Sequence, residues 1–182
     1  MQQPEREHAA GTREVEHTLL ILKPDAVEQD ICLHVLHRIV HAIENGRIRA
    51  SRILRLSPEI LRQHYAHIVE EPFYPRIEKF MLSSEVWVTL LEGKRGSIEK
   101  IRELIGATDP RKAAPGTIRA EFGKVVGEAI FNVVHASDSE ENAEREIRLF
   151  FLEEEIRNVL PELADRIWKR ANGAGKRLDE IA

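Results

Sequence analysis

The chain lacks several features that would place it in a particular class of protein. Its single cysteine, Cys32, cannot form a disulfide within the chain, which suits a reducing compartment. No stretch approaches the roughly 18 consecutive apolar residues that a membrane span needs. Residues 1–16 are polar and lack the apolar core of a secretion signal. We therefore expect no membrane association and a cytoplasmic location.

An excess of charge of one sign is also lacking. The formal net charge is −4, and the two signs are interspersed along the chain. Such a surface gives no reason to expect nucleic-acid binding, so an anionic ligand would have to be held by a local basic cluster. Apolar residues make up 42% of the chain and charged residues 32%, which is typical of a globular protein rather than a disordered one.

Three segments are predicted from changes of pattern along the 182 residues. Residues 1–16 form a flexible N-terminal extension. Residues 17–151 form one domain, in which predicted strands and helices alternate. Residues 152–182 form a C-terminal helical extension, whose amphipathic helix is expected to bury Leu163, Ile167 and Trp168.

Hydrophobic periodicity predicts the order of elements in the domain. The predicted strands span 17–22, 48–56, 86–91 and 131–134. The predicted helices span 31–44, 58–69, 76–82 and 98–105, with a last helix that begins near Ser139 and buries Ala143, Ile147, Phe150 and Phe151. Residues 106–116 form a loop. This order predicts an α+β, ferredoxin-like split βαβ sandwich with a four-stranded antiparallel sheet and an inserted helical hairpin.

A histidine stands where the last predicted strand gives way to a helix. In Asn132-Val-Val-His135-Ala-Ser137-Asp138-Ser139, the last two residues are favoured helix N-caps, so backbone N–H groups and a positive dipole end favour an anion there. A neutral imidazole at this place can attack phosphorus if another group, such as Glu146, fixes its tautomer. From this segment alone, a strand-end histidine satisfied by capping is the commoner outcome.

Side chains that can hold phosphate recur at the ends of the predicted elements. Lys23 stands where the first strand stops, Arg102 lies on the helix before the loop, and Thr108 and Arg119 flank the loop. Phosphoryl transfer requires chiefly positioning and charge stabilisation by such groups and by a metal ion. Each of them is individually more often a solvated surface residue, so only their convergence would be meaningful.

Six blocks of sequence carry a more specific signal. They are Thr18-Leu-Leu-Ile-Leu-Lys23-Pro-Asp-Ala-Val27, His64-Tyr65, Glu71-Pro-Phe-Tyr74, Gly106-Ala-Thr-Asp-Pro110, Ala114-Pro-Gly-Thr-Ile-Arg119, and Asn132-Val-Val-His-Ala-Ser-Asp-Ser139 followed by Glu144-Arg-Glu-Ile147. Together they resemble the successive motifs of the nucleoside diphosphate kinase family, in the family's order and nearly its spacing, over residues 17–151. A short insertion before the histidine resembles archaeal-type members.

The resemblance implies a role for each matching residue. His135 would be phosphorylated on Nδ1, with Glu146 orienting its ring and Ser137 supplying a neighbouring hydroxyl. Lys23 and Asn132 would meet the ribose 3′-hydroxyl, and Lys23 would also reach the transferring phosphate. The other matches are Arg102, Thr108 and Arg119 as a phosphate clamp, Tyr65 near the transferred group, Phe73 as the ring on which the base stacks, and Val126 as its opposite jaw.

The resemblance also implies the reaction and the partners. A nucleoside triphosphate would donate its γ-phosphoryl group to the histidine, and a nucleoside diphosphate would then take it in a ping-pong cycle. Mg²⁺ is expected to arrive with the nucleotide, because the sequence shows no carboxylate cage that would hold it as a protein-bound metal. A dimer-based tetramer or hexamer is expected from the same resemblance.

Two alternatives remain open. Residues 29–34, Gln-Asp-Ile-Cys-Leu-His, replace a glycine-containing run that is usual in the family, so the chain could be an inactive nucleotide-binding or scaffold relative. The intact His135 and its matching neighbours argue against this. A metal-binding protein is the second alternative, because His34, His37 and His41 share one helix face and His64 and His67 form another i, i+3 pair. Solvated helix histidines are the commoner outcome.

Overall fold

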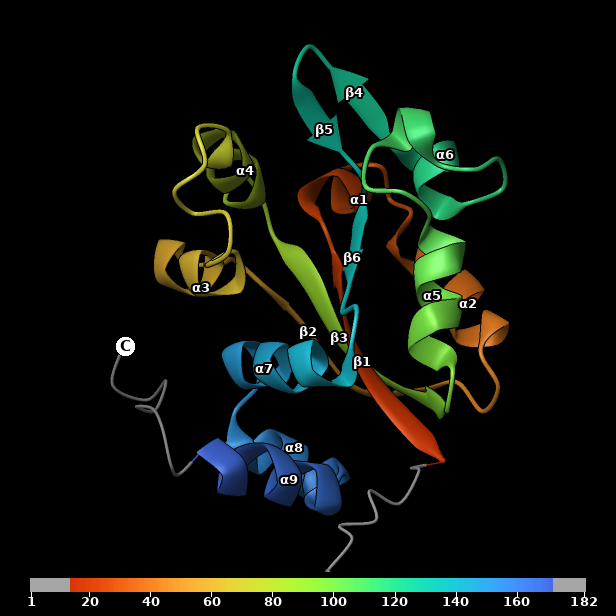
Figure 1. The fold of residues 1–182 in the computed structure, drawn as a ribbon, viewed down its shortest axis with the longest axis vertical. Coiled ribbons are helices and arrows are strands. Elements are labelled where there is room, and N and C mark those ends of the chain that lie inside the picture. Colours follow the sequence, from red (N-terminus) through yellow and green to blue (C-terminus); the bar gives the residue numbers. More distant parts are fainter. Residues whose placement is uncertain (1–13, 172–182) are drawn as a thin grey trace, which may run out of the picture.

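The computed structural model describes residues 14–171, so most of the N-terminal extension and the end of the C-terminal extension lie outside the described residues. The main sheet has the order β2-β3-β1-β6, and every neighbouring pair is antiparallel. Its strands are β1 (Val15–Leu22), β2 (Arg47–Leu54), β3 (Val86–Lys94) and β6 (Val134–Ala136). This arrangement (Figure 1) confirms the predicted α+β, ferredoxin-like fold with a four-stranded antiparallel sheet.

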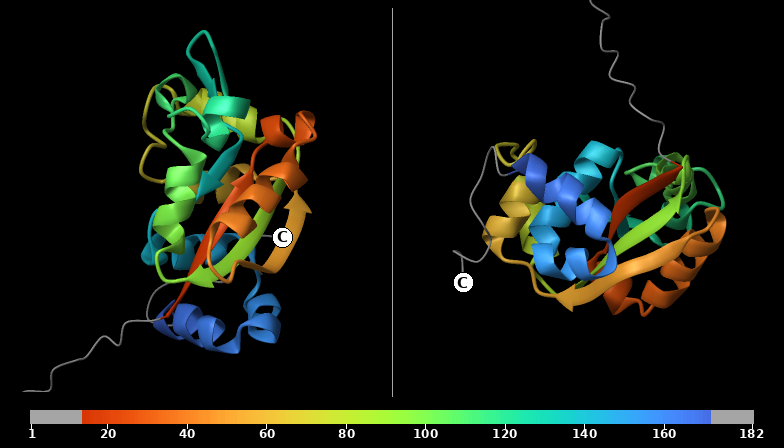
Figure 2. Two further views of the ribbon diagram at one scale, coloured as in Figure 1. Left: turned by 90° about the vertical axis from the view of Figure 1, so that its right-hand side faces the viewer. Right: turned by 90° about the horizontal axis from the view of Figure 1, so that it is seen from below.

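Helices cover both faces of the sheet (Figure 2). One face carries α1 (Pro24–Glu28), α2 (Cys32–Ala42), α5 (Ser97–Ile105) and α6 (Ile118–Phe122). The other face carries α3 (Pro58–His64), α4 (Tyr74–Met81), α7 (Glu140–Phe150), α8 (Glu153–Val159) and α9 (Pro161–Ala171). A short 3-10 turn, η1 (Pro110–Lys112), lies in the predicted loop.

The central strand β1 joins the two halves of the core. Leu19 and Ile21 contact the cluster under α7, whereas Leu20 and Leu22 contact the cluster under α2 and α5, and all four side chains are fully buried. A strand buried on both faces must be apolar at every position rather than at alternate ones. This accounts for the continuous apolar run that predicted the strand.

Edge strand β2 departs from the predicted alternation. We expected Ile48, Ala50 and Leu54 to face the core, but Ile48 is 48% exposed and Ile53 is 57% exposed. The register between β2 and β3 shifts between Ile48 and Ala50, which is a β-bulge. Because an extra residue turns the preceding side chains to the opposite face, Ile48 points outward while Arg52 shares the inner face.

The predicted helix over 58–69 is wrong at its end, because α3 stops at His64. Beyond it the Ile68 N–H bonds the Tyr65 carbonyl oxygen at 2.8 Å, which is the three-residue spacing of a turn. The apolar spacing continues past the helix end, so periodicity could not show where the hydrogen-bond pattern changes.

The predicted last strand over 131–134 is also wrong, because it is divided. Phe131 ends β5 (Ala129–Phe131), which pairs with β4 (Lys124–Val126) in a hairpin outside the main sheet. Val133 has a φ of 54°, in the left-handed region that a β-branched residue rarely adopts, so the strand cannot continue through it. His135 consequently lies within β6 and pairs with Ile21 of β1.

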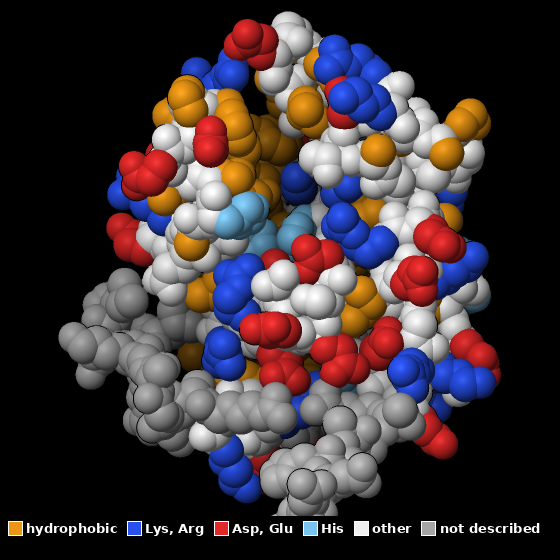
Figure 3. All heavy atoms as spheres, viewed as in Figure 1, with side chains coloured by type: hydrophobic (Ala, Val, Ile, Leu, Met, Phe, Trp, Pro, Cys, Tyr) orange, Lys and Arg blue, Asp and Glu red, His pale blue; other side chains and the backbone are white. Residues whose placement is uncertain are grey.

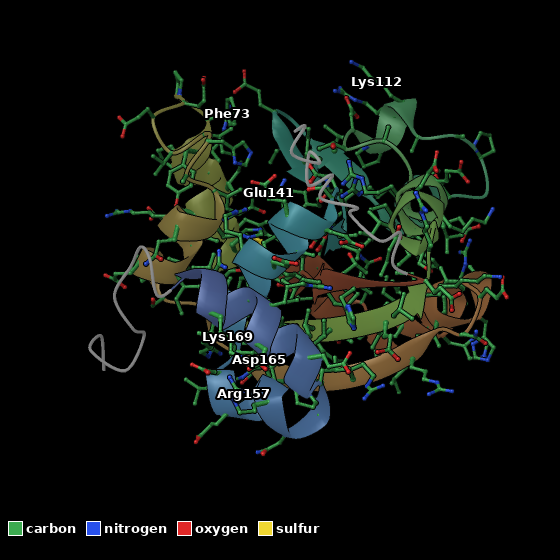
Figure 4. The ribbon with its side chains drawn as sticks, turned by 60° about the horizontal axis from the view of Figure 1, so that its bottom comes forward. Phe73, Lys112, Glu141, Arg157, Asp165 and Lys169 are labelled. Carbon is green, nitrogen blue, oxygen red and sulfur yellow. The ribbon has the colours of Figure 1, made fainter. Side chains whose placement is uncertain are left out.

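The C-terminal extension packs on the face of the sheet that carries α7. Leu163 and Ile167 are buried in that core as predicted, whereas Trp168 is only partly buried. Asp165 of α9 pairs with Arg157 of α8 at 2.8 Å and with Lys169 at 2.9 Å. All three residues are labelled in Figure 4. Within residues 14–171 no helix has the length and apolar character to span a membrane.

Candidate active site

A cavity of about 1300 Å³ opens between the α3–α4 segment, the β4–β5 hairpin and the end of the sheet. In Figure 3 histidine side chains lie in a hollow between hydrophobic side chains and Lys or Arg side chains. Most residues singled out in the sequence line this cavity: Lys23, Tyr65, Phe73, Arg102, Thr108, Arg119, Asn132, His135 and Glu146. Side chains that lie up to 123 positions apart in the sequence therefore face one space.

His135 and Glu146 form the centre of the site. The His135 Nε2 atom lies 3.1 Å from both carboxylate oxygens of Glu146, which comes from α7. Burial alone would raise the pKa of Glu146, but the hydrogen bond from His135, the electrostatic interactions with the His135 and His64 rings and the hydrogen bond from Ser137 lower the pKa to about 2. The carboxylate is therefore ionised and can only accept, so Nε2 carries the ring proton.

In the neutral ring, this assignment leaves Nδ1 of His135 with a lone pair. Among the described residues, Nδ1 has no hydrogen-bond partner, and the His135 side chain is 21% exposed at the cavity. A ring nitrogen with an available lone pair, held by a carboxylate on the opposite nitrogen, is an oriented nucleophile.

Ser137 anchors the carboxylate instead of lining the cavity. Its hydroxyl donates to the Glu146 Oε2 atom at 2.6 Å and accepts from the Leu19 N–H at 3.1 Å. The fully buried strand β1 thereby fixes the serine, and the serine fixes Glu146. Ser139 caps α7 by accepting from the Asn142 N–H at 3.2 Å, as the sequence predicted.

Three cationic side chains line the cavity together with His135. Arg119 is buried and donates to the carbonyl oxygens of Gly106 at 3.0 Å and Val134 at 2.8 Å, while Arg102 donates to the Ala136 carbonyl oxygen at 3.2 Å. Burial and the charge of Arg102 lower the pKa of Arg119 to about 10. Both guanidinium groups are held by backbone carbonyls of the strand that carries the histidine, so their positive charge is fixed in place.

The third cationic side chain is Lys23, which is bonded to Asn132. The Lys23 Nζ atom donates to the Asn132 Oδ1 atom at 2.6 Å, and Asn132 donates to the Thr108 carbonyl oxygen at 2.8 Å. Burial and the nearby charge of Arg119 lower the pKa of Lys23 to about 8. The ammonium group thus remains mostly charged at neutral pH, beside an amide that can also meet a ligand hydroxyl.

The strained residue Val133 is held from both sides. Its N–H donates to the Asp25 Oδ2 atom at 3.0 Å, and its carbonyl oxygen accepts from the Lys23 N–H at 2.9 Å. Asp25 is itself buried. Because strain at a left-handed valine persists only where the surroundings impose it, this carboxylate fixes the link that carries Asn132 on one side and His135 on the other.

Of the remaining predicted residues, Phe73 and Tyr65 line the cavity and Val126 does not. Phe73 is 41% exposed and precedes α4 (Figure 4), while Tyr65 caps α3. Val126 is 61% exposed and is not brought to the cavity wall, which at the hairpin is formed by residues 128–131. Phe131 is fixed by an edge-to-face contact with Phe80, at 4.9 Å between ring centroids.

The sequence analysis gave no role at this site to two buried residues, His64 and Asp25. His64 packs edge-to-face on His135 at 4.7 Å between ring centroids, although the sequence suggested a metal-binding pair with His67. Asp25 was part of a motif that ends a strand. Only tertiary structure brings these side chains to the histidine, and no local pattern around either residue signals it.

Comparisons with known proteins show the family of this chain. The sequence profile described as nucleoside diphosphate kinase matches residues 16–156. The chain belongs to the nucleoside diphosphate kinase family. A nucleoside diphosphate kinase of Pyrococcus horikoshii is 41% identical over 157 residues, which are 86% of this chain and 98% of that protein. One of Archaeoglobus fulgidus is 42% identical over 154 residues, covering 85% of this chain and 97% of the relative.

A solved structure extends the similarity to three dimensions. The crystal structure of the Aquifex aeolicus nucleoside diphosphate kinase superposes with a TM-score of 0.69 at 40% sequence identity, covering 78% of this chain and 98% of that one. The profile match over residues 16–156 includes the residues that line the cavity. The profile match also runs past residue 151 into α8.

Proposed function

We propose that this chain transfers the γ-phosphoryl group of a nucleoside triphosphate to a nucleoside diphosphate through a phosphohistidine at His135. Family membership provides the overall reaction, which is phosphoryl transfer between nucleotides. The observation that supports a phosphohistidine intermediate is the pair of 3.1 Å contacts from the His135 Nε2 atom to the ionised carboxylate of Glu146. This arrangement leaves the Nδ1 lone pair as the nucleophile at the cavity.

Each half of the cycle makes and breaks one bond at phosphorus. Nδ1 of His135 attacks the γ-phosphorus, the bond from phosphorus to the β-phosphate oxygen breaks, and the diphosphate leaves. A second diphosphate then attacks through a terminal oxygen, and the nitrogen–phosphorus bond breaks. The ring gains positive charge when Nδ1 is phosphorylated, and the adjacent Glu146 carboxylate stabilises that charge.

The cationic side of the cavity supports the charge requirement of this reaction. Lys23, Arg102 and Arg119 line the cavity together with the histidine. Their charges can offset the negative charge on the equatorial oxygens of the transferring group, and the backbone anchors of the two arginines spare those side chains reorganisation during the reaction. We assign Thr108 to the same phosphate clamp, and Lys23 and Asn132 to the ribose 3′-hydroxyl.

The outer end of the cavity is suited to a base of any kind. We propose that the base stacks on the half-exposed ring of Phe73, with the β4–β5 hairpin on its other side and Tyr65 nearer the transferred group. Stacking discriminates poorly between bases because every base has a π-face. We therefore expect purine and pyrimidine diphosphates to be accepted alike.

The expected cation is Mg²⁺ bound to the nucleotide. The phosphate end of the cavity, as far as the described residues show, presents basic side chains rather than a carboxylate cage. This donor set fits a cation that arrives on the phosphates and keeps much of its water. Lys23, Arg102 and Arg119 would hold the phosphate oxygens that the ion does not.

The inactive or scaffold alternative has no observation in its favour, because residues 29–34 lie at the end of α1 and the start of α2 and are not among those lining the cavity.

We further propose a cytoplasmic homo-oligomer. Its support is the single buried Cys32 and the exposed Leu33, Ile48 and Ile53, of which the two isoleucines lie on edge strand β2. Light scattering of the purified chain tests the assembly.

A transfer assay tests the proposed reaction. Wild type, supplied with ATP and Mg²⁺, should phosphorylate the diphosphates of guanosine, uridine and cytidine with modest preferences among them. His135→Ala should phosphorylate none of them. His41→Ala, a change at an exposed histidine of α2, is the matched control and should retain full activity. Transfer by His135→Ala at the wild-type rate would overturn the proposal.

A further inference from the structure

Behind the reactive face of His135 lies a group of side chains that the proposed transfer uses only in part. One nitrogen each from His64 and His135 and one carboxylate oxygen of Glu146 all lie within 4.8 Å of one another. His64 is 2% exposed, and its Nδ1 atom is buried without a hydrogen-bond partner among the described residues. This atom points at the Glu146 Oε1 atom from 3.6 Å, which is too far for a hydrogen bond.

An unpartnered nitrogen facing a carboxylate is the arrangement that a cation would satisfy. The His64 ring is buried, which disfavours its charged form, so one of its nitrogens carries a lone pair. Contacts with His135, Tyr65 and Phe150 hold the ring in its orientation.

Two of the three ligand-to-ligand distances in the cluster suit a small transition-metal ion. Ligand atoms about 2.0–2.1 Å from a tetrahedral zinc ion lie about 3.3–3.4 Å from each other. The contacts of Glu146 with His135 at 3.1 Å and with His64 at 3.6 Å are close to that spacing. All three residues are among those that line the cavity. Two imidazoles and one carboxylate favour zinc or cobalt over Mg²⁺.

The geometry points to an inhibitory transition-metal site made by His64, His135 and Glu146, in which a divalent ion such as Zn²⁺ occupies the lone pair of His135 Nε2. This inference rests on the proposed function, because it concerns the same histidine. It is separate from the Mg²⁺ that accompanies the nucleotide, and the ion is not needed for the reaction.

An ion bound at Nε2 would inhibit phosphoryl transfer because it changes which nitrogen of His135 carries the proton. A neutral imidazole has one proton, which lies on Nε2 while Glu146 accepts it. An ion bound at Nε2 needs that lone pair, so the proton moves to Nδ1 and no proton leaves the ring. Nδ1 then has no lone pair with which to attack phosphorus, and the chain stops accepting a phosphoryl group.

Cobalt binding tests the site without any measurement of activity. Co²⁺ titrated into the chain should give one equivalent of visible absorption typical of tetrahedral nitrogen and oxygen ligation. His64→Phe, which keeps a buried ring, and His135→Ala should each weaken this binding by at least about tenfold. The double variant His37→Ala/His41→Ala, which removes an exposed histidine pair on α2, should bind as wild type does.

Labelling then tests the consequence. Wild type loaded with Zn²⁺, desalted and exposed for seconds to γ-labelled ATP with Mg²⁺ should take up at least about tenfold less label than untreated protein, and a chelator should restore labelling.

Unchanged Co²⁺ binding by folded His64→Phe or His135→Ala, or loss of binding in the α2 double variant, would overturn the site. Full labelling of the zinc-loaded chain would overturn the tautomer switch. Absence of labelling in metal-free wild type would instead contradict the proposed function, while the Co²⁺ titration would still decide the site.

Discussion

The position of one proton on the His135 ring decides what this side chain can do. Glu146 is buried and ionised, accepts from Nε2 and is itself held by Ser137. Replacing the carboxylate by an amide keeps the size of the side chain but adds a donor. The amide N–H could donate to Nε2 and thereby favour the tautomer with the proton on Nδ1.

We therefore expect Glu146→Gln to lower the rate of His135 phosphorylation by about 10²–10⁴-fold, because the nucleophilic nitrogen is protonated in much of the population. Rapid-quench labelling with γ-labelled ATP measures this rate. Nucleotide affinity, measured by calorimetry with a non-hydrolysable triphosphate, should change little. A labelling rate within twofold of wild type would show that the carboxylate does not set the tautomer.

Lys23 should make kcat/KM depend on pH in the alkaline range. Burial and the charge of Arg119 lower its pKa to about 8, so the ammonium is charged below that pH and loses its proton as the pH rises through it. Because only the charged form attracts phosphate, we expect kcat/KM to fall above about pH 8. In Lys23→Arg this fall should disappear from the pH profile, since a guanidinium stays charged there. An identical alkaline limb in both proteins would assign it to another group.

At the scale of elements, the short link between β5 and β6 positions the reactive residues. Its Val133 is buried in a left-handed conformation and donates its N–H to Asp25. Removal of the acceptor leaves a buried N–H unpaired at a strained residue.

Asp25→Ala should lower the free energy of unfolding by about 1–3 kcal/mol, as expected for an unsatisfied buried donor. It should also raise KM for nucleotides, because Asn132 precedes the released residue. Asp25→Asn retains an acceptor and should lose less of both. Urea unfolding and steady-state kinetics measure these effects, and equal losses in the two variants would show that the hydrogen bond to Val133 is not the cause.

The elements also show what sequence could and could not predict. Strand β1 and helices α2, α5 and α7 each have enough residues for their apolar period to be recognised. The β4–β5 hairpin has strands of three residues and α6 has five, which are too short to establish a period. The bulge in β2 and the left-handed Val133 are backbone events that leave no pattern of hydrophobicity.

The candidate site was predictable as a list of residues, mainly through resemblance, but not as an arrangement. Lys23, Arg119 and His135 meet because β1, α6 and β6 converge on one end of the sheet. Nothing around His64 in the sequence indicates that it contacts His135, since the two lie 71 positions apart and pair through the core.

For the molecule as a whole, the C-terminal extension completes the core. Leu163, Ala164 and Ile167 of α9 are buried in the same cluster as Phe150 of α7, the helix that carries Glu146. The extension is also fastened to the sheet, because Arg49 of β2 donates to the Val159 carbonyl oxygen at 2.7 Å. The family match stops at residue 156, but the packing continues through α9.

Truncating a buried side chain of α9 should therefore destabilise the whole domain. We expect Ile167→Ala to lower the free energy of unfolding by about 2–5 kcal/mol, because a fully buried side chain leaves a cavity. Val159→Ala, at a side chain 37% exposed, is the matched control and should cost less than about 1 kcal/mol. Chemical denaturation measures both, and a loss in Ile167→Ala no larger than in the control would mean that α9 does not share the core.

The most direct test of the account is to locate the phosphoryl group on the protein. Wild type incubated with ATP and Mg²⁺ and examined by ³¹P–¹H NMR, with His135→Ala beside it, should carry one phosphoryl group on Nδ1 of His135. The label should be stable to alkali, labile to acid and absent from the variant. A phosphoryl group on Nε2, or on another residue that survives His135→Ala, would contradict the claim that Glu146 holds the ring with Nδ1 as its nucleophile.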